Sequence, residues 1–282
     1  MQVQNGAVTL HVGIAGDRSA SPLLLMHGIT VSHATWDWLI PSLAGRFRVL
    51  ALDFRGHGKS GRAPDDYQPQ AYVTDAIAVL EELADGPAVV IGHSLGGMTG
   101  AALIQQRPDL VRAAVLEDPP LSSMETGSAI QANPLLDAFR LMRATVPELQ
   151  KNNVPVAAIA GTMATMPSSS GQPMGQLIVA DAIEVMARAL LDLDASVLDP
   201  ILDGTAKNSF DRALPIEVPT MILSADPAMP DALATPEVVN PLMEISPLVE
   251  HRAIPGAGHL VHDGLATREG FVDQVEEFLE RF

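Results

Sequence analysis

The serine best suited to covalent chemistry in this chain lies in the pentapeptide GHSLG at positions 92–96. An apolar run, residues 88–91, comes directly before it, and a segment that reads as a helix, residues 95–106, follows it. A buried strand, a serine between two glycines and then a helix form the context of a G-x-S-x-G nucleophile elbow. The flanking glycines leave room for the strained backbone of the serine. The pattern predicts that Ser94 presents its hydroxyl at the carboxyl edge of a sheet.

Two backbone N–H groups are candidates for an oxyanion hole. The N–H of Leu95 lies at the start of the expected helix and points toward the place where an oxyanion would form. The second candidate is Ile29, which follows His27-Gly28 at the end of an expected buried strand, residues 23–26. A glycine there lets the backbone approach a ligand closely. We expect His27 itself to be structural.

A histidine near the carboxyl terminus is the candidate base. His259 ends the glycine-rich segment PGAGH, which follows an expected strand at residues 250–254. A loop at a strand end is held by a rigid sheet and can still reach a neighbouring strand end. We therefore expect His259 to face the serine.

The elements that must position these residues alternate along the chain. After a hairpin at residues 3–12, strands are expected at 23–26, 49–52, 88–91 and 113–116, with helices between them. Two more strands, 218–223 and 250–254, precede a final helix. This rhythm predicts an α/β fold with a mostly parallel sheet covered on both faces. It is interrupted by helical patterns at 134–146 and 178–193, with a loop-like stretch, 164–173, between them.

Composition excludes several classes of function. The 282 residues carry 34 acidic and 17 basic side chains, a formal charge of −17, which disfavours binding to nucleic acid or to an anionic membrane. There is no cysteine, the amino terminus does not resemble a signal peptide, and no uncharged apolar run is long enough to span a bilayer. We expect a cytoplasmic protein.

Neither a cofactor nor a metal is expected. The glycines surround a serine and not a phosphate cradle, so no nucleotide cofactor is indicated. His259 and His262 are three residues apart, as metal ligands can be, but no clustered carboxylate and histidine set accompanies them. For His262 we expect a solvated or capping role.

These motifs together resemble the α/β-hydrolase superfamily. The resemblance rests on His27-Gly28, the loop 53–60, the elbow at Ser94 and the segment 256–259 with His259. It implies a hydrolase core formed by residues 1–121 and 213–282, with residues 122–212 as an inserted helical cap. It also implies Ser94 as nucleophile and His259 as general base, oriented by a carboxylate.

The carboxylate that orients His259 is the uncertain member of the three expected catalytic residues. In most members of the superfamily it would align with position 228, which is alanine here. Asp226 lies two residues earlier and could reach His259 after a small shift of the loop. Asp118 ends the strand after the elbow helix, where haloalkane dehalogenases and zearalenone lactonases carry the acid. We favour Asp118, keep Asp226 as the rival, and rank Glu117 third because alternation along the strand turns it the other way.

A serine at the elbow argues for acyl transfer to water and against the alkyl-enzyme chemistry that an aspartate would support. The favoured function is hydrolysis of a carboxylic ester or lactone of a small, fairly apolar molecule. The alternatives are carbon–carbon bond hydrolysis by the same residues, or a ligand-binding or signalling protein on a hydrolase scaffold. The sequence does not reveal the substrate or the oligomeric state.

Overall fold

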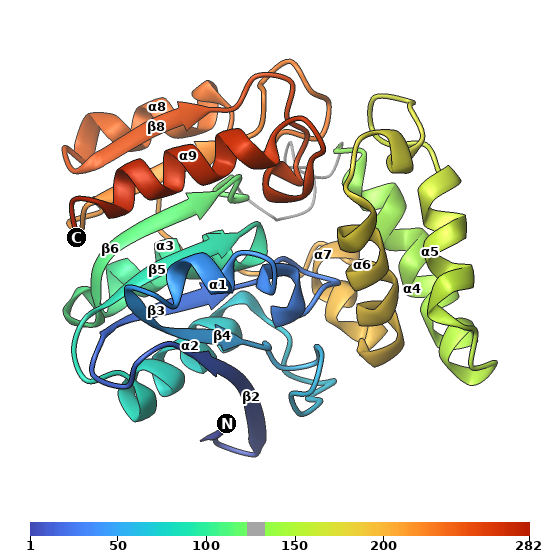
Figure 1. Cartoon of the computed structure of the whole chain (residues 1–282), viewed down its shortest axis with the longest axis horizontal. Coiled ribbons are helices and arrows are strands. Elements are labelled where there is room, and N and C mark those ends of the chain that lie inside the picture. Colours follow the sequence, from blue (N-terminus) through green and yellow to red (C-terminus); the bar gives the residue numbers. More distant parts are fainter. Residues whose placement is uncertain (123–132) are drawn as a thin grey trace.

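The computed structural model describes residues 1–122 and 133–282, and its centre is a sheet of eight strands in the order β1-β2-β4-β3-β5-β6-β7-β8 (Figure 1). β2 is antiparallel to β1 and β4, whereas β4, β3, β5, β6, β7 and β8 are mutually parallel. The strands are β1 (Gln2–Asn5), β2 (Val8–Ala15), β3 (Ser21–Met26), β4 (Phe47–Leu52), β5 (Ala88–His93), β6 (Val111–Glu117), β7 (Thr220–Ser224) and β8 (Val249–Ala253).

Helices cover both faces of this sheet. Alternate side chains of β5 enter two separate cores: Val90 packs with residues of α2 and α3, and Val89 and Ile91 pack with the final helix. The helices of the two layers are α1 (Ile40–Leu43), α2 (Pro69–Leu83), α3 (Leu95–Gln106), α8 (Pro236–Ile245) and α9 (Arg268–Leu279). The predicted α/β architecture, with a mostly parallel central sheet, is confirmed.

In the described part of the stretch between β6 and β7 lie four further α-helices: α4 (Leu135–Lys151), α5 (Val156–Thr165), α6 (Ala180–Asp192) and α7 (Asp199–Leu202). Figure 1 shows α4, α5 and α6 as a group on one side of the sheet. Backbone hydrogen bonds join this group to the rest, from Val179 N to Asp263 O (3.0 Å) and from Leu265 N to Leu177 O (2.7 Å). The first part of the predicted insertion, residues 123–132, lies outside the described residues.

Among the described helices, the short α7 and the longer α5 and α8 were not expected from the sequence. α5 is rich in alanine and buries only Ile159 and Met163, so its apolar face gives little periodic signal. α8 begins at Pro236 and contains Pro241, a residue normally taken as a helix breaker. Within the described residues, no helix combines the length and the apolar character needed to cross a membrane.

Candidate active site

The turn at Ser94 connects β5 to α3 and has the backbone of a strained elbow. Ser94 has φ 51° and ψ −110°. A Cβ on Gly92 would lie 2.3 Å from the carbonyl oxygen of Gly96, and a Cβ on Gly96 would lie 2.3 Å from the carbonyl oxygen of Met26. Both contacts are with backbone, which cannot move aside as a side chain could. The two glycines are therefore required by the close packing of β3, β5 and α3.

Strain is concentrated around this turn. In the described part of the chain, the non-glycine residues with positive φ are Thr30, Ser94, Asp118 and Asn153. Thr30 follows the proposed oxyanion residue Ile29, and Ser94 and Asp118 lie at the ends of the neighbouring strands β5 and β6. Such conformations cost about 1–3 kcal/mol each and cluster at functional sites.

Asp118 and His259 are in direct contact. Asp118 Oδ2 lies 2.7 Å from His259 Nδ1, and the carboxylate is fully buried. It also accepts hydrogen bonds from the backbone N–H groups of Leu233 (3.1 Å) and Ala234 (2.9 Å). Because a carboxylate can only accept, His259 donates from Nδ1 and keeps Nε2 free to act as a base.

Asp226, the rival acid, is held elsewhere. Its two carboxylate oxygens accept hydrogen bonds from Gly256 N (2.7 Å) and Ala228 N (2.9 Å). These two backbone hydrogen bonds lower the pKa of Asp226 below its ordinary value. Asp226 thus ties the loop after β7 to the glycine-rich segment that leads to His259.

His93, next to the serine, supports the loop that carries His259. Its Nε2 donates to the carbonyl oxygen of His259 (3.0 Å), and the two rings lie 4.8 Å apart between centroids. Burial lowers the pKa of His93 to about 3, so the ring is neutral. The hydrogen bond connects β5 directly to the loop after β8.

The expectation of a solvated or capping role for His262 was wrong. Its side chain is only 1% exposed, and its Nδ1 lies 2.8 Å from Oε2 of the equally buried Glu117. Burial would lower the pKa of His262, but the charges of Asp263 and Glu117 outweigh burial and raise it. The His262 Nε2 faces Thr35 Oγ1 at 3.0 Å, and Trp36 stacks on the ring. The side chain is buried because long-range packing supplies these partners, which a loop sequence does not reveal.

Ile29 and Leu95 carry the two candidate oxyanion donors. Both line one pocket together with Ser94. A Cβ on Gly28 would lie 3.5 Å from Ser94 Cβ, so the turn before Ile29 is in contact with the elbow. Leu95 is the first residue of α3, and the first four N–H groups of a helix have no partner inside it.

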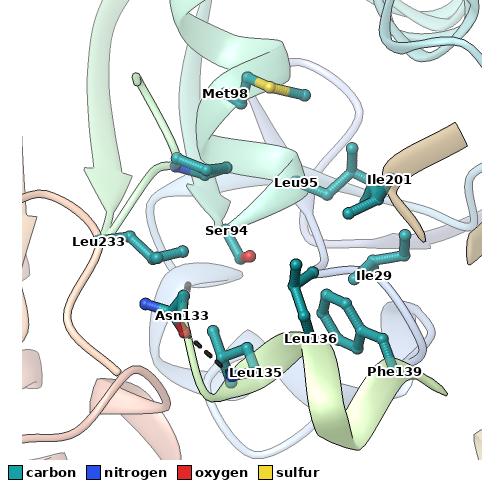
Figure 2. A pocket seen from close by; sticks show the side chains of 11 residues that line it. Ile29, Ser94, Leu95, Met98, Asn133, Leu135, Leu136, Phe139, Ile201 and Leu233 are labelled. Atoms are coloured by element: carbon teal, nitrogen blue, oxygen red, sulfur yellow. Dashed lines mark hydrogen bonds between the residues drawn. The ribbon is translucent and has the colours of Figure 1, made fainter. Parts of the chain in front are cut away.

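The pocket above Ser94 contains about 450 Å³ of empty space, part of it open to solvent, and the described residues that line it are mostly apolar. Figure 2 shows the side chains of Leu136, Phe139 and Ile201, which come from α4 and α7, on one side of the Ser94 hydroxyl. Among the described residues of the wall, Asn133 is the other polar one, and its Oδ1 accepts from Leu135 N at 3.0 Å. The wall also includes Met98, Pro120, Leu135 and Leu233. Sequence reasoning missed these residues because they meet only after α4 and α7 fold over the sheet edge.

Comparisons with known proteins show which family the chain belongs to. The chain is 35% identical over 133 residues to 2-(acetamidomethylene)succinate hydrolase of Mesorhizobium japonicum, a match that spans 46% of this chain and 47% of that relative. It is 27% identical over 266 residues to mouse sn-1-specific diacylglycerol lipase ABHD11, covering 94% of this chain and 82% of the relative.

The structure of N-formylmaleamic acid deformylase from Pseudomonas putida S16 superposes with a TM-score of 0.74 at 21% identity, over 98% of this chain and 99% of that one. The model of the alpha/beta hydrolase family matches residues 23–274. With its elbow, its sheet order and this match over most of its length, the chain belongs to the alpha/beta hydrolase family.

Proposed function

We propose that this chain is a serine hydrolase that cleaves a carboxylic ester or lactone of a small, apolar molecule through an acyl-enzyme intermediate. The single observation that carries the proposal is the hydrogen bond between Asp118 and His259 beside the strained elbow of Ser94. Membership in a family of hydrolases supports the same reaction class. We also propose residues 122–212 as the cap over residues 1–121 and 213–282.

In this mechanism Ser94 Oγ attacks the carbonyl carbon while His259 Nε2 takes its proton, and Asp118 stabilises the imidazolium that forms. The N–H groups of Ile29 and Leu95 donate hydrogen bonds to the negatively charged carbonyl oxygen, each worth about 3 kcal/mol in comparable enzymes. His259 then gives the proton to the leaving alcohol. A water molecule, activated by the same histidine, releases the acid and restores Ser94.

The walls of the pocket support a neutral, apolar substrate. Among the described residues that line it, none carries a positive charge, and the formal charge of the whole chain is −17. A carboxylate brought into such a pocket would lose its water without gaining a partner. A dicarboxylate, as in the name of the Mesorhizobium relative, is therefore a poor candidate substrate for this chain.

The test is pre-steady-state hydrolysis of neutral p-nitrophenyl esters, a lactone panel and one anionic half-ester by the wild type and Ser94→Ala. We expect a burst of one nitrophenol per enzyme with the neutral esters, no burst with Ser94→Ala, and slow turnover of the anionic ester. Labelling of Ser94 by a fluorophosphonate probe gives an independent readout.

A burst that survives Ser94→Ala would contradict the proposed nucleophile. Absence of both turnover and labelling would instead favour a binding protein on a hydrolase scaffold. Turnover of a vinylogous diketone with cleavage of its carbon–carbon bond, and none of any ester, would reassign the reaction.

A further inference from the structure

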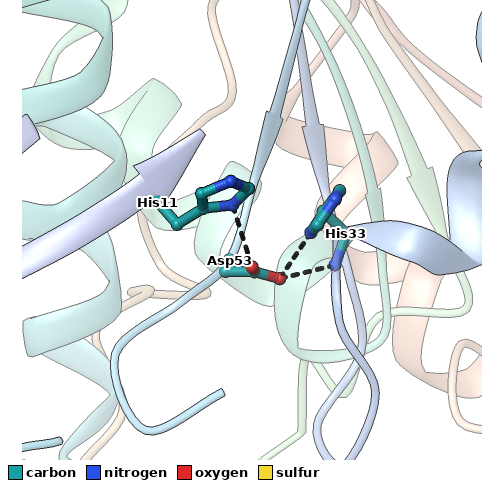
Figure 3. A group of neighbouring side chains, drawn as sticks. All are labelled: His11, His33 and Asp53. Carbon is teal, nitrogen blue, oxygen red and sulfur yellow. Dashed lines mark hydrogen bonds and ion pairs between the residues drawn. The ribbon is translucent and has the colours of Figure 1, made fainter. Parts of the chain in front are cut away.

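A second group of chemistry-bearing side chains lies outside the proposed active site, at the end of β4. Asp53 follows β4 directly, His11 comes from β2, and His33 comes from the 3-10 helix His33–Trp36. Figure 3 shows the two imidazole rings on either side of the Asp53 carboxylate. His11 Nδ1 lies 3.1 Å from Oδ2, and His33 Nδ1 lies 2.9 Å from Oδ1.

These distances match the spacing around one small cation. The nitrogen and oxygen atoms that the three side chains offer all lie within 4.8 Å of one another. With metal–ligand bonds of about 2.0–2.1 Å, neighbouring ligands of a tetrahedral ion are about 3.4 Å apart. An ion would replace the two protons now shared between the imidazoles and the carboxylate, and the three ligand atoms would move together around it.

The backbone holds the three side chains in place. Asp53 Oδ1 also accepts from His33 N (2.8 Å), and Oδ2 accepts from Lys59 N (3.0 Å). Asp53 N donates to the carbonyl oxygen of His11 (3.0 Å). Hydrogen bonds of this kind orient the ligands of metal sites, and here they hold the Asp53 carboxylate between the two imidazoles.

Access separates this group from the buried one near the active site. The side chains of His11 and His33 are 21% and 17% exposed, which gives an ion a path from solvent and leaves room for water ligands. His93, Glu117 and His262 also bring their ligand atoms within 4.8 Å, but all three are buried. The net charge of −17 favours cations near the surface.

We propose that His11, His33 and Asp53 bind one first-row divalent transition metal ion, of which Zn²⁺ suits the two imidazoles and one carboxylate best. Imidazole nitrogens select zinc, nickel, copper or cobalt over Mg²⁺ and Ca²⁺, which prefer oxygen. The ion connects β2, the end of β4 and the segment that follows Ile29. Its role is to brace that segment, and binding does not depend on the hydrolytic activity.

The test is a titration of tag-free, chelator-treated protein with Co²⁺ followed by visible absorption, and with Zn²⁺ in competition with a chromophoric chelator. The variants are His11→Asn and His33→Asn, because an asparagine amide can still donate to Asp53. His251→Asn is the matched control: His251 is a partly buried histidine on β8 whose Nε2 lies 2.9 Å from Ser224 Oγ. Circular dichroism checks that each variant is folded.

We expect one saturable site per chain in the wild type and in the control, with a rise of the Tm on adding Zn²⁺. Each of the other two variants should weaken binding by about 100-fold, and the Tm rise should disappear. Lys59→Gln should tighten binding by a few-fold, because the Lys59 charge acts on His11 and opposes a second cation. The readouts are binding and unfolding, so they stay valid if the proposed hydrolase activity is wrong.

Failure of the wild type to bind either ion would overturn the proposal. So would binding that His11→Asn and His33→Asn leave unchanged, since the ion would then be held by another part of the acidic surface.

Discussion

At the scale of single residues, the proposed chemistry depends on which carboxylate orients His259. Asp118 is buried and within 2.7 Å of Nδ1, whereas the oxygens of Asp226 accept from Gly256 and Ala228. An asparagine at position 118 could present its amide to Nδ1 and leave the imidazole in the wrong tautomer.

We predict that Asp118→Asn lowers kcat by about 10⁴-fold for a good ester substrate. Asp226→Asn is the comparison variant and should lower kcat/KM far less, through the loss of one of the two backbone hydrogen bonds in its loop. Steady-state kinetics on both variants measures this. Loss of activity in Asp226→Asn alone would assign the acid to the rival position.

The Glu117–His262 pair beneath the site is a second residue-scale feature. Burial would raise the pKa of Glu117, but the charge and hydrogen bonds of His262 outweigh burial and lower it below its ordinary 4.5. The pKa of His262 is raised above 6.5. The ionised glutamate therefore stabilises the fold at pH values above 4.5, and this stabilisation is lost as the pH falls through the lowered pKa of Glu117. The protonated histidine stabilises the fold at pH values below 6.5, and this stabilisation is lost as the pH rises through the raised pKa of His262.

Glu117→Gln should accordingly lower the free energy of unfolding by about 3 kcal/mol, the cost of breaking a buried ion pair. The difference from wild type should be largest between about pH 4.5 and 6.5 and shrink on both sides. Urea unfolding across this range, with the exposed Glu244→Gln as control, checks it. A difference independent of pH would mean that the pair is not ionised.

At the scale of elements, the elbow works because β3, β5 and α3 pack without side chains between them. Gly96 is where the first turn of α3 touches the end of β3, and Gly161 offers a contrast because nothing lies within 4 Å of a Cβ placed there in α5. The same substitution has opposite consequences at the two positions.

We expect Gly96→Ala to destabilise the protein by about 3 kcal/mol, because its Cβ would overlap the Met26 carbonyl oxygen. Gly161→Ala should stabilise it by up to about 1 kcal/mol through helix propensity. Urea denaturation of both variants gives the comparison. A stable, fully active Gly96→Ala would show that α3 can move away from β3.

At the scale of the whole molecule, the pocket exists only between two parts of the chain. The sheet edge supplies Ser94, Ile29 and Leu95, and the helices between β6 and β7 supply Leu136, Phe139 and Ile201. α4 is joined to α7 by an ion pair of Arg143 with Asp199. Substitutions in these helices should therefore change which substrates are selected without changing the reaction at Ser94.

Phe139→Ala should raise KM for a hexanoyl ester by about ten-fold and leave the acetyl ester almost unchanged, because the longer chain buries more apolar surface against the pocket wall. Leu141→Ala is the control, since Leu141 lies on the same helix but is 47% exposed and outside the pocket wall. KM values for a series of acyl lengths measure the effect. An unchanged chain-length preference would argue against α4 as part of the substrate site.

The sequence by itself determined the features that depend on neighbouring residues. The glycines around Ser94 follow from local sterics, and the alternation of strands and helices follows from the periodicity of apolar residues. The hairpin of β1 and β2, the start and end of α3 and the α/β class were all correctly predicted in this way.

Only the tertiary structure decided which side chains meet. It brings the loop 225–234 to Asp118, buries His262 against Glu117 and gathers His11, His33 and Asp53 from three separate segments. These contacts join residues far apart in the chain, and no local pattern encodes them. The predicted pairing of Asp118 with His259 is a contact of this kind, because the two residues lie 141 positions apart in the chain and meet only when β6 and the loop after β8 share one edge of the sheet.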